Sequence, residues 1–301
     1  KLLLKGKDIK LLDDDYLLDE VLGLVEFPNV LIGNIDKQFM NLPKEVLTTA
    51  MKVHQKYFSI IDDKNNLVPK FLFVSNTIPK KERDKSIIEG NERVLKARLS
   101  DADFFWKTDT STKIENLNEK LKKVLFYEGL GSLHDKTIRL SAVSKYFSSL
   151  FKVDVSLARE ACILSKFDLV SEMVGEFPEL QGIMGGYYTK LNGKPNEISN
   201  AIFDQYKPKG ISNDMPKTKL GCMLSMIDNI DNLTGFFIIN KKPSGSKDPF
   251  ALRRAGYSIV QILIKLKLNI SINDLFNETL KSYENSSKII KLITFERQLL
   301  G

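Results

Sequence analysis

The sequence predicts an α+β protein in which a mixed α+β domain over residues 1–110 precedes an all-α domain over residues 111–301. Three observations lead to this prediction. The β-rich runs all fall in the first hundred residues, helical periodicity dominates after residue 113, and the polar segment Thr108–Lys113 has the composition of a link. With 301 residues, of which 43% are apolar, the chain is long enough for two cores.

Short helices and strands alternate in the predicted first domain. Apolar residues at helical spacing indicate helices, and β-branched or aromatic runs between turn residues indicate strands. Proline favours the first helical turn, where its missing N–H needs no partner. The expected elements are helices over 17–25 and from Pro43 to His54, a strand over 30–35, and a hairpin of residues 57–61 and 67–74.

A longer helix is expected at the end of the first domain. It should begin after Gly90-Asn91 and place Leu95, Leu99, Ala102 and Trp106 on one apolar face. The polar segment after it would then connect the two domains.

The second domain is expected to be a succession of amphipathic helices. Gly129 and Gly131 should end the first of them, and Asp154 should cap the third. Asp248 followed by Pro249 is a strong start signal for the last. The apolar stripes are Leu117, Leu121, Val124 and Leu125; Ile138, Ala142, Val143, Phe147 and Leu150; Leu157, Ala161 and Leu164; Leu220, Met223, Leu224, Ile227 and Ile230; and Leu252, Ala255, Ile259, Ile262 and Leu266.

Positive charge is concentrated in one part of the chain. The net charge is +7, and residues 207–256 carry nine basic and four acidic side chains, which makes a polyanion a likelier partner than an acidic protein. Within this part, the Ser-Gly-Ser turn leads into an expected helix N-terminus, whose free amides favour phosphate. The candidate residues for contact with nucleic acid are Lys241, Lys242, Lys247, Arg253 and Arg254. The alternative is a structural turn whose arginines pair with carboxylates such as Glu176 or Glu179.

Few residues indicate catalysis. The two histidines, His54 and His134, lie in different predicted domains, and no nucleotide-binding or hydrolase motif occurs. Asp228 and Asp231, three residues apart on one helix, could hold Mg²⁺ or share a proton, or they could belong to a solvated face. Cys162 and Cys222 lie in apolar runs and are expected to be reduced core thiols.

The densest stretch of the chain runs from Ala161 to Tyr188. It joins an apolar helical segment to a turn with proline, glycine and several polar residues. Such a passage either builds a site or packs a tight corner between helices.

No apolar run is long enough to span a bilayer, and the amino end lacks a secretory signal, so a cytoplasmic protein is expected. Because the chain begins with Lys1, it is expected to be a fragment.

Five runs resemble the β subunit of bacterial heterotetrameric glycyl-tRNA synthetase. They are LPKEVLTTAMKVHQKYF (42–58), GNERVLKARLSDADFFWKTD (90–109), KVLFYEGLGSLHDKTIRL (123–140), DLVSEMVGEFPELQGIMGGYY (168–188) and KKPSGSKDPFALRRAG (241–256). The resemblance extends in order from about Leu24 to the end of the chain.

The resemblance implies an α2β2 ligase that attaches glycine to tRNA(Gly) with ATP and Mg²⁺. In that family the α subunit carries the active site, and the β subunit mainly binds and positions tRNA. The resemblance thus makes the five basic residues from Lys241 to Arg254 named above candidate tRNA-binding residues. This chain would be an internal piece of the β subunit, without bound cofactor, inactive alone, and with the α subunit and tRNA(Gly) as partners rather than DNA or a membrane.

The resemblance also implies that the second domain has the HD phosphohydrolase fold. The first His position of that fold falls on Lys136, the His-Asp pair on Ser165-Lys166 or Phe167-Asp168, and the last Asp on Asp228 or Asp231. The degenerate positions are therefore Lys136, Lys166, Asp168, Asp228 and Asp231, and a lysine there would repel a metal ion.

Two other functions remain open on the sequence. One is a stand-alone HD-type phosphohydrolase that depends on Asp168 or Asp231 and a metal. The other is a purely structural module that bridges to the α subunit without contacting RNA.

Overall fold

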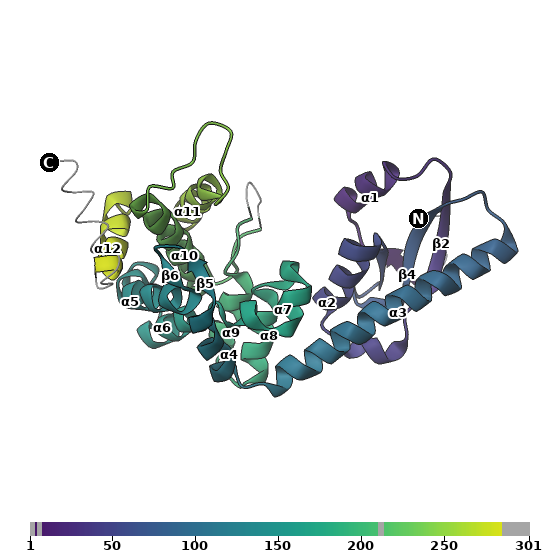
Figure 1. The fold of residues 1–301 in the computed structure, drawn as a ribbon, viewed down its shortest axis with the longest axis horizontal. Helices are drawn as coiled ribbons and strands as arrows, with labels where there is room; N and C mark the ends of the chain where they lie inside the picture. The colour runs from purple at the N-terminus through teal and green to yellow at the C-terminus, as the bar shows by residue number, and fades with distance from the viewer. Residues whose placement is uncertain (1–3, 5–7, 210–213, 285–301) are drawn as a thin grey trace. The chain divides into compact units, whose positions relative to one another are not determined.

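The computed structural model describes residue 4, residues 8–209 and residues 214–284 (Figure 1). The chain forms two compact units. One consists of Lys1–Ser111 with Glu176–Leu180, and the other of Thr112–Gly175 with Gln181–Gly301. The first contains a four-stranded sheet and the second is mainly helical, which confirms the α+β class.

An antiparallel sheet organises the first unit. Its strand order is β1-β3-β4-β2, and β3 and β4 form the predicted hairpin. The turn between them is fixed by Asp62, whose carboxylate accepts from the backbone N–H of Asn66 at 2.8 Å. The strands are β1 (Ile9–Leu11), β2 (Pro28–Asn34), β3 (Phe58–Asp62) and β4 (Leu67–Asn76).

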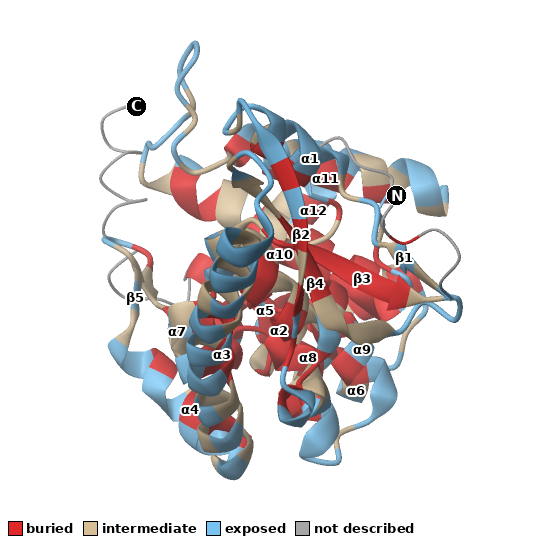
Figure 2. Cartoon of the chain, turned by 90° about the vertical axis from the view of Figure 1, so that its right-hand side faces the viewer, coloured by how far each residue is buried: buried red, intermediate tan, exposed pale blue. Residues whose placement is uncertain are grey.

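One core of the first unit lies between this sheet and helix α1 (Asp15–Leu22). Leu17 and Val21 of α1 are buried in one cluster with strand residues such as Ile60. Helix α2 (Lys44–Thr49) continues into a π turn, Ala50–His54, so the predicted helix 43–54 is present in two parts. Figure 2 shows β3 mainly in the buried colour and much of α3 in the exposed colour, while in β4 only the middle of the strand is buried.

Helix α3 (Lys81–Ser111) is longer than the sequence predicted at both ends. Gly90 lies inside it, where a Cβ atom would meet nothing within 4 Å. A helix tolerates such a glycine because the cost is only about 1 kcal/mol. The predicted link over Thr108–Lys113 is wrong for most of its length, since α3 continues to Ser111. The predicted inner face is confirmed for Leu95, Leu99 and Ala102, which are all buried.

Helix α10 is the centre of the second unit, where it packs against α5, α9, α11 and α12. Most of its side chains are buried, in line with the predicted stripe from Leu220 to Ile230. The helices are α4 (Ile114–Lys120), α5 (Leu133–Phe151), α6 (Val155–Ile163), α7 (Glu172–Glu176), α8 (Ile183–Leu191), α9 (Asn196–Asp204), α10 (Lys219–Ile238), α11 (Leu252–Leu266) and α12 (Ile272–Glu284).

A small hairpin interrupts the helical unit. The sequence predicted one helix as far as Gly129, but α4 ends at Lys120 and the chain then forms β5 (Leu125–Tyr127) and β6 (Gly131–Ser132). Gly129 and Gly131 both have φ of 84°, a left-handed conformation that glycine adopts without strain. The two glycines therefore build the hairpin instead of ending a helix.

The buried face of α5 differs from the predicted one. Ile138 and Ala142 are exposed, whereas Lys136 and Arg139 are buried beside Leu140. Val143 and Phe147 of the predicted stripe are buried as expected. The prediction is wrong for Ile138 and Ala142, because the buried face also includes two charged residues whose partners lie on another helix.

Two helix starts were predicted from capping residues. Asp154 caps α6 as expected, and its carboxylate accepts from the N–H of Leu157 at 2.9 Å. Helix α11 begins at Leu252, later than Pro249, yet Asp248 still accepts from the N–H groups of Leu252 and Arg253. The expectation of Asp248 as N-cap and Pro249 at the first helical position is therefore wrong, since the N-cap is Ala251, although the carboxylate of Asp248 still pairs with first-turn N–H groups.

Gly185 and Gly186 lie within α8 at its contact with α9. A Cβ on Gly186 would come within 2.8 Å of Cβ of Phe203 and 3.0 Å of the carbonyl oxygen of Ser199. A Cβ on Gly185 would lie 2.8 Å from Cγ2 of Ile202. The Ala161–Tyr188 stretch thus contains a tight helix corner.

Replacing Gly186 by alanine is expected to lower the free energy of unfolding by about 1–3 kcal/mol, because the added methyl group overpacks the contact with α9. Chemical denaturation measures the change. The matched control is Gly256→Ala in α11, where a Cβ meets nothing within 4 Å and alanine should stabilise by up to about 1 kcal/mol. Equal effects at both positions would contradict the packing argument.

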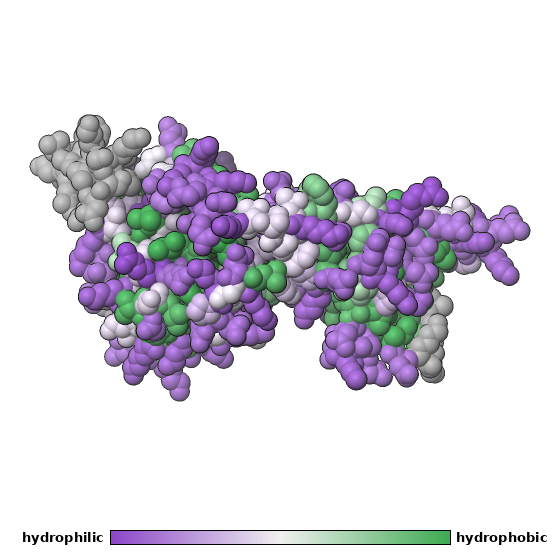
Figure 3. Space-filling view, turned by 90° about the horizontal axis from the view of Figure 1, so that it is seen from below, coloured by the Kyte–Doolittle hydropathy of each residue, from purple (hydrophilic) through white to green (hydrophobic). Residues whose placement is uncertain are grey.

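On the face seen in Figure 3, the surface is mainly hydrophilic, with apolar residues in separate patches. In the part of the chain that the structure describes, no helix combines the length and the apolar character needed to cross a membrane.

Candidate functional site: a buried charge network beside a polar pocket

A network of buried charged side chains lies at the centre of the second unit. Lys136 and Arg139 come from α5, and Asp228 and Asp231 come from α10. Each pair is spaced three residues apart and so shares one helix face. The fifth member, Lys166, directly precedes the 3₁₀ turn Phe167–Val170. Four of the five degenerate HD-like positions are therefore brought together, and Arg139 joins them.

Lys136 links the two aspartates. Its Nζ lies 2.9 Å from Oδ1 of Asp228 and 2.8 Å from Oδ2 of Asp231. It also donates to Oδ1 of Asn232 at 2.8 Å. The ammonium group thus stands between carboxylates that would otherwise be the ligands of a cation.

Arg139 holds the other side of Asp231. Its Nε lies 2.9 Å from Oδ1 of Asp231, and its Nη1 donates to the carbonyl oxygen of Leu130 at 3.0 Å. The hydroxyl group of Tyr283 donates to the same Oδ1 of Asp231 at 2.8 Å. Nothing in the spacing of the sequence could have identified Arg139, Asn232 or Tyr283, since their partners are brought together only by helix packing.

Lys166 neutralises the second oxygen of Asp228. Its Nζ lies 2.9 Å from Oδ2 of Asp228 and 3.0 Å from Oε1 of Gln205. It also contacts Tyr206, whose hydroxyl oxygen is 3.2 Å away and whose ring centroid is 4.3 Å away.

The charges of this network decide the protonation of its aspartates. Burial alone would raise the pKa of Asp228, but the ammonium groups of Lys136 and Lys166 hold that pKa well below its usual 3.8. Burial acts in the same way on Asp231, and there Lys136 and Arg139 lower the pKa. Both carboxylates are therefore ionised, and three cations surround them.

Asp168, the remaining degenerate position, has other partners. Its Oδ2 accepts from the backbone N–H groups of Gly182 at 2.5 Å and Gly185 at 3.0 Å. Its Oδ1 is buried and has no hydrogen-bond partner among the residues that the structure describes. Burial raises the pKa of Asp168 to about 6, although the two N–H groups and Lys166 oppose the rise. Asp168 thus holds the helix corner together rather than facing the two aspartates of α10 as a fellow ligand.

These residues do not fit a metal ion. Lysine ammonium groups contact both carboxylates of α10, and their positive charge would repel a cation at that place. Among the described residues, no group of three or more His, Cys, Asp and Glu side chains is arranged to hold a metal. Asp228 and Asp231 are also 6% and 1% exposed, so the alternative of a solvated face is wrong.

The other candidates for reactive chemistry have structural surroundings. The His54 ring packs edge-on against Phe177, with ring centroids 5.5 Å apart. Cys162 and Cys222 are buried free thiols, and burial raises the pKa of each. Neither cysteine is poised as a nucleophile, because the reactive form is the thiolate.

A polar pocket of about 470 Å³ opens beside the network. Asp228 and Asn232 contribute to both the network and the pocket lining. The other lining residues are Gln181, Gln205, Tyr206, Pro208, Lys209, Asn229, Phe250, Ala251, Arg254, Ala255 and Ser258.

The five predicted tRNA-binding residues lie in or just after the loop between α10 and α11. All five side chains are exposed, and in the described part of the chain none of them forms an ion pair. The loop contains a narrow turn in which Ser244 and Lys247 pair. Arg253 braces this turn, since its Nη2 donates to the carbonyl oxygen of Gly245 at 2.8 Å.

The helix N-terminus beside this loop is not free for phosphate. The carboxylate of Asp248 already accepts from the N–H groups of Leu252 at 2.8 Å and Arg253 at 2.9 Å. The predicted phosphate site on these amides is therefore wrong. A polyanion would instead contact the exposed cationic side chains of the loop.

Glu176 has a different partner from the one considered on the sequence. Its carboxylate pairs with Arg98 of α3 at 2.9 Å within the first unit. The alternative pairing of Glu176 with an arginine of α11 is therefore wrong.

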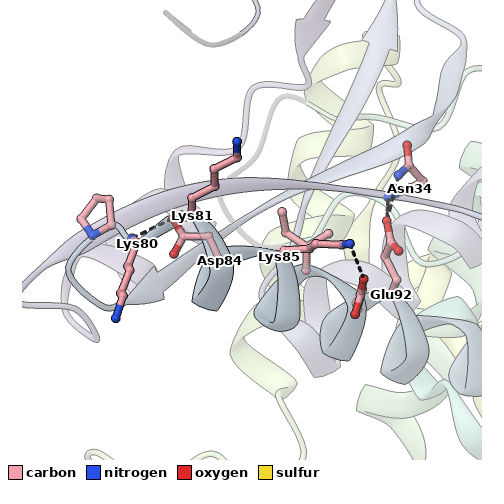
Figure 4. A pocket seen from close by; sticks show the side chains of 9 residues that line it. Asn34, Lys80, Lys81, Asp84, Lys85 and Glu92 are labelled. Atoms are coloured by element: carbon pink, nitrogen blue, oxygen red, sulfur yellow. Dashed lines mark hydrogen bonds and ion pairs between the residues drawn. The ribbon is translucent and has the colours of Figure 1, made fainter.

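The first unit has a pocket of its own beside the start of α3 (Figure 4). Its three carboxylates already have partners. Asp84 accepts from the N–H of Lys80, Glu89 pairs with Lys85, and Glu92 accepts from the N–H of Asn34. Because these groups satisfy one another, we place the candidate site in the second unit.

Comparison with known proteins gives one consistent result. The sequence model of the family described as "Glycyl-tRNA synthetase beta subunit" matches residues 2–300. The glycine--tRNA ligase beta subunit of Chromohalobacter salexigens is 45% identical over 263 residues, which cover 87% of this chain and 38% of that relative. The corresponding proteins of Rickettsia canadensis and Marinobacter nauticus are 44% and 43% identical, over 95% and 86% of this chain and 42% and 37% of theirs. The chain thus spans about two-fifths of the length of these relatives.

Proposed function

This chain belongs to the glycyl-tRNA synthetase beta subunit family, and from this premise we propose that it helps to bind and position tRNA(Gly) in an α2β2 ligase. In the proposed enzyme, the α subunit carries the active site and uses ATP and Mg²⁺ to attach glycine to tRNA. The chain described here would supply RNA contacts and part of the assembly with the α subunit.

The observation that carries the proposal is the exposed basic loop of the second unit. Lys247 belongs to the turn that Arg253 braces, Lys241 and Lys242 precede it in the same loop, and none of the three has a carboxylate partner among the described residues. Cations that are not already neutralised can replace the counterions of an RNA backbone, and this exchange is the main source of non-specific affinity for nucleic acid. Arg253 and Arg254 extend the same positive surface onto α11.

The charge network argues against the rival function of an HD-type phosphohydrolase. Such an enzyme needs carboxylates and imidazoles that converge on a metal ion. Here Lys136 and Lys166 take up the carboxylate oxygens instead, so the same helices form a scaffold with internal ion pairs.

The test of the proposal is the triple variant Lys241→Ala, Lys242→Ala, Lys247→Ala. If all three lysines contact phosphates, the slope of log affinity for tRNA(Gly) against log salt should become shallower by about 3, and affinity at low salt should fall about tenfold or more. Filter binding or fluorescence anisotropy over a salt series measures both quantities.

A control variant removes three exposed lysines elsewhere in the second unit, Lys123, Lys145 and Lys190. It changes the net charge equally and should leave the slope nearly unchanged. If the loop variant kept the full slope while it still co-purified with the α subunit, the bridging function without RNA contact would replace our proposal.

A further inference from the structure

The pocket beside the charge network contains polar groups that the fold does not use. In the described part of the chain, Nδ2 of Asn232 and Oδ1 of Asn229 form no hydrogen bond, although each side chain is anchored through its other polar atom. Arg254 also lines the pocket without a carboxylate partner in that part of the chain. One amide donor, one amide acceptor and one guanidinium group are therefore available to a ligand.

The charge beside the pocket suits an anion. Asp228 lines the pocket, but Lys136 and Lys166 contact its two oxygens at 2.9 Å. The buried network contains three cationic side chains and only the two anionic aspartates of α10, so its net charge is positive. Lys209 and Arg254 add further positive charge at the pocket wall. A phosphate group can approach such a surface, whereas a metal ion would be repelled.

An aromatic ring completes the pocket. Phe250 lines it and stacks on Phe236, with ring centroids 4.3 Å apart and an angle of 17° between the planes. Tyr127 packs edge-on against both rings, which fixes Phe250 in place. A nucleobase placed on a preformed aromatic platform gains stacking energy whatever its sequence.

We propose that this pocket binds one nucleotide, with its phosphate on Arg254 and Lys209 and its base on Phe250. The amides of Asn229 and Asn232 then meet polar edges of the base or sugar. The volume of about 470 Å³ lies in the range of small-ligand pockets. The occupant is either a free nucleotide or one unstacked nucleotide of an RNA chain, and the proposal does not require tRNA binding by the lysines of the loop.

The experiment is isothermal titration calorimetry of this chain with each of the four nucleoside 5′-monophosphates, the matching nucleosides, inorganic phosphate and a short single-stranded oligoribonucleotide. A nucleotide should bind more tightly than either its nucleoside or phosphate alone. Arg254→Ala and Phe250→Leu should each weaken binding about tenfold or more. Matched controls are Lys265→Ala and Tyr257→Leu, exposed residues of α11 that do not line the pocket, and each should change affinity less than about twofold.

Each result has a defined meaning. Binding of mononucleotides that both pocket variants weaken supports a free nucleotide as the ligand. Binding of the oligoribonucleotide alone, weakened by the same variants, supports an unstacked RNA nucleotide. Absence of binding by every probe, or equal binding by wild type and a folded Arg254→Ala variant, overturns the proposal. Arg254 is exposed, so this variant should fold even if Phe250→Leu does not. A failure of the loop-lysine test would leave these results unaffected, because no lysine of that test lines the pocket.

Discussion

Replacement of Asp231 by alanine is expected to lower the free energy of unfolding by about 3–5 kcal/mol. The substitution leaves the ammonium group of Lys136 and the guanidinium group of Arg139 buried beside a lost counter-charge. It also removes the acceptor that Oδ1 provides for the hydroxyl group of Tyr283. Uncompensated charges in a buried site cost much more than the intact ion pair contributes, so the loss should be large. Denaturation with urea, followed by circular dichroism, measures it.

The control for this prediction is Glu119→Ala. Glu119 also pairs with a lysine, Lys122, at 2.6 Å, but both side chains are largely exposed. The substitution there should change the free energy of unfolding very little, because water screens the exposed pair. If Asp231→Ala cost no more than this surface control, the network would not be the structural centre of the unit. A phosphohydrolase would show a different pattern, in which the substitution mainly abolished turnover and metal binding.

The second large effect is a pH dependence that originates at Asp168. Burial raises the pKa of this carboxyl group from 3.8 in the unfolded chain to about 6 in the folded protein. Between these values the folded state keeps a proton that the unfolded state has released, so stability falls as the pH rises. The difference of 6 − 3.8 = 2.2 pH units corresponds to about 3 kcal/mol. The protonated carboxyl group of Asp168 therefore contributes fully to the free energy of unfolding below about pH 4, and this contribution is lost as the pH rises through about 6.

Asp168→Asn isolates this contribution. An asparagine can still accept from the N–H groups of Gly182 and Gly185, but it does not titrate. The free energy of unfolding of the wild type minus that of the variant should decrease by roughly 2–3 kcal/mol between pH 4 and pH 7. The lowered pKa values of Asp228 and Asp231 act in the opposite direction, because the stabilisation from these groups is lost as the pH falls. Both groups are present in wild type and variant, so their contributions cancel when one free energy of unfolding is subtracted from the other. A constant difference over this range would show that Asp168 titrates normally in the folded state.

Local patterns predicted many elements because those elements depend on neighbouring residues. The hairpin of β3 and β4 followed from two β-rich runs around a polar turn, and Asp154 caps α6 as expected. The start of α3 was missed because Gly90 suggested a boundary, whereas a single glycine inside a long helix costs little. The strands β5 and β6 were missed because a three-residue and a two-residue strand carry almost no periodicity.

The site was only partly predictable. The resemblance to a known family indicated Lys136, Lys166, Asp228 and Asp231 as related positions, but the sequence did not show that the lysines lie directly on the aspartates. Arg139 was assigned to no site, since a polar residue on a helix is normally exposed. The basic loop was visible as a charge concentration, yet the capping of its helix by Asp248 depended on the fold of the loop.

By itself, the sequence determined the fold class, most helices of the second unit, the family and the concentration of positive charge, because each is encoded in residue type and local spacing. Only the tertiary structure decided which charges are buried and which are free. Lys136 meets Asp231 at a sequence separation of 95, and such a pairing arises from the packing of α5 on α10. For this reason the same residue types form a neutralised interior network at one place and an exposed cationic surface at another.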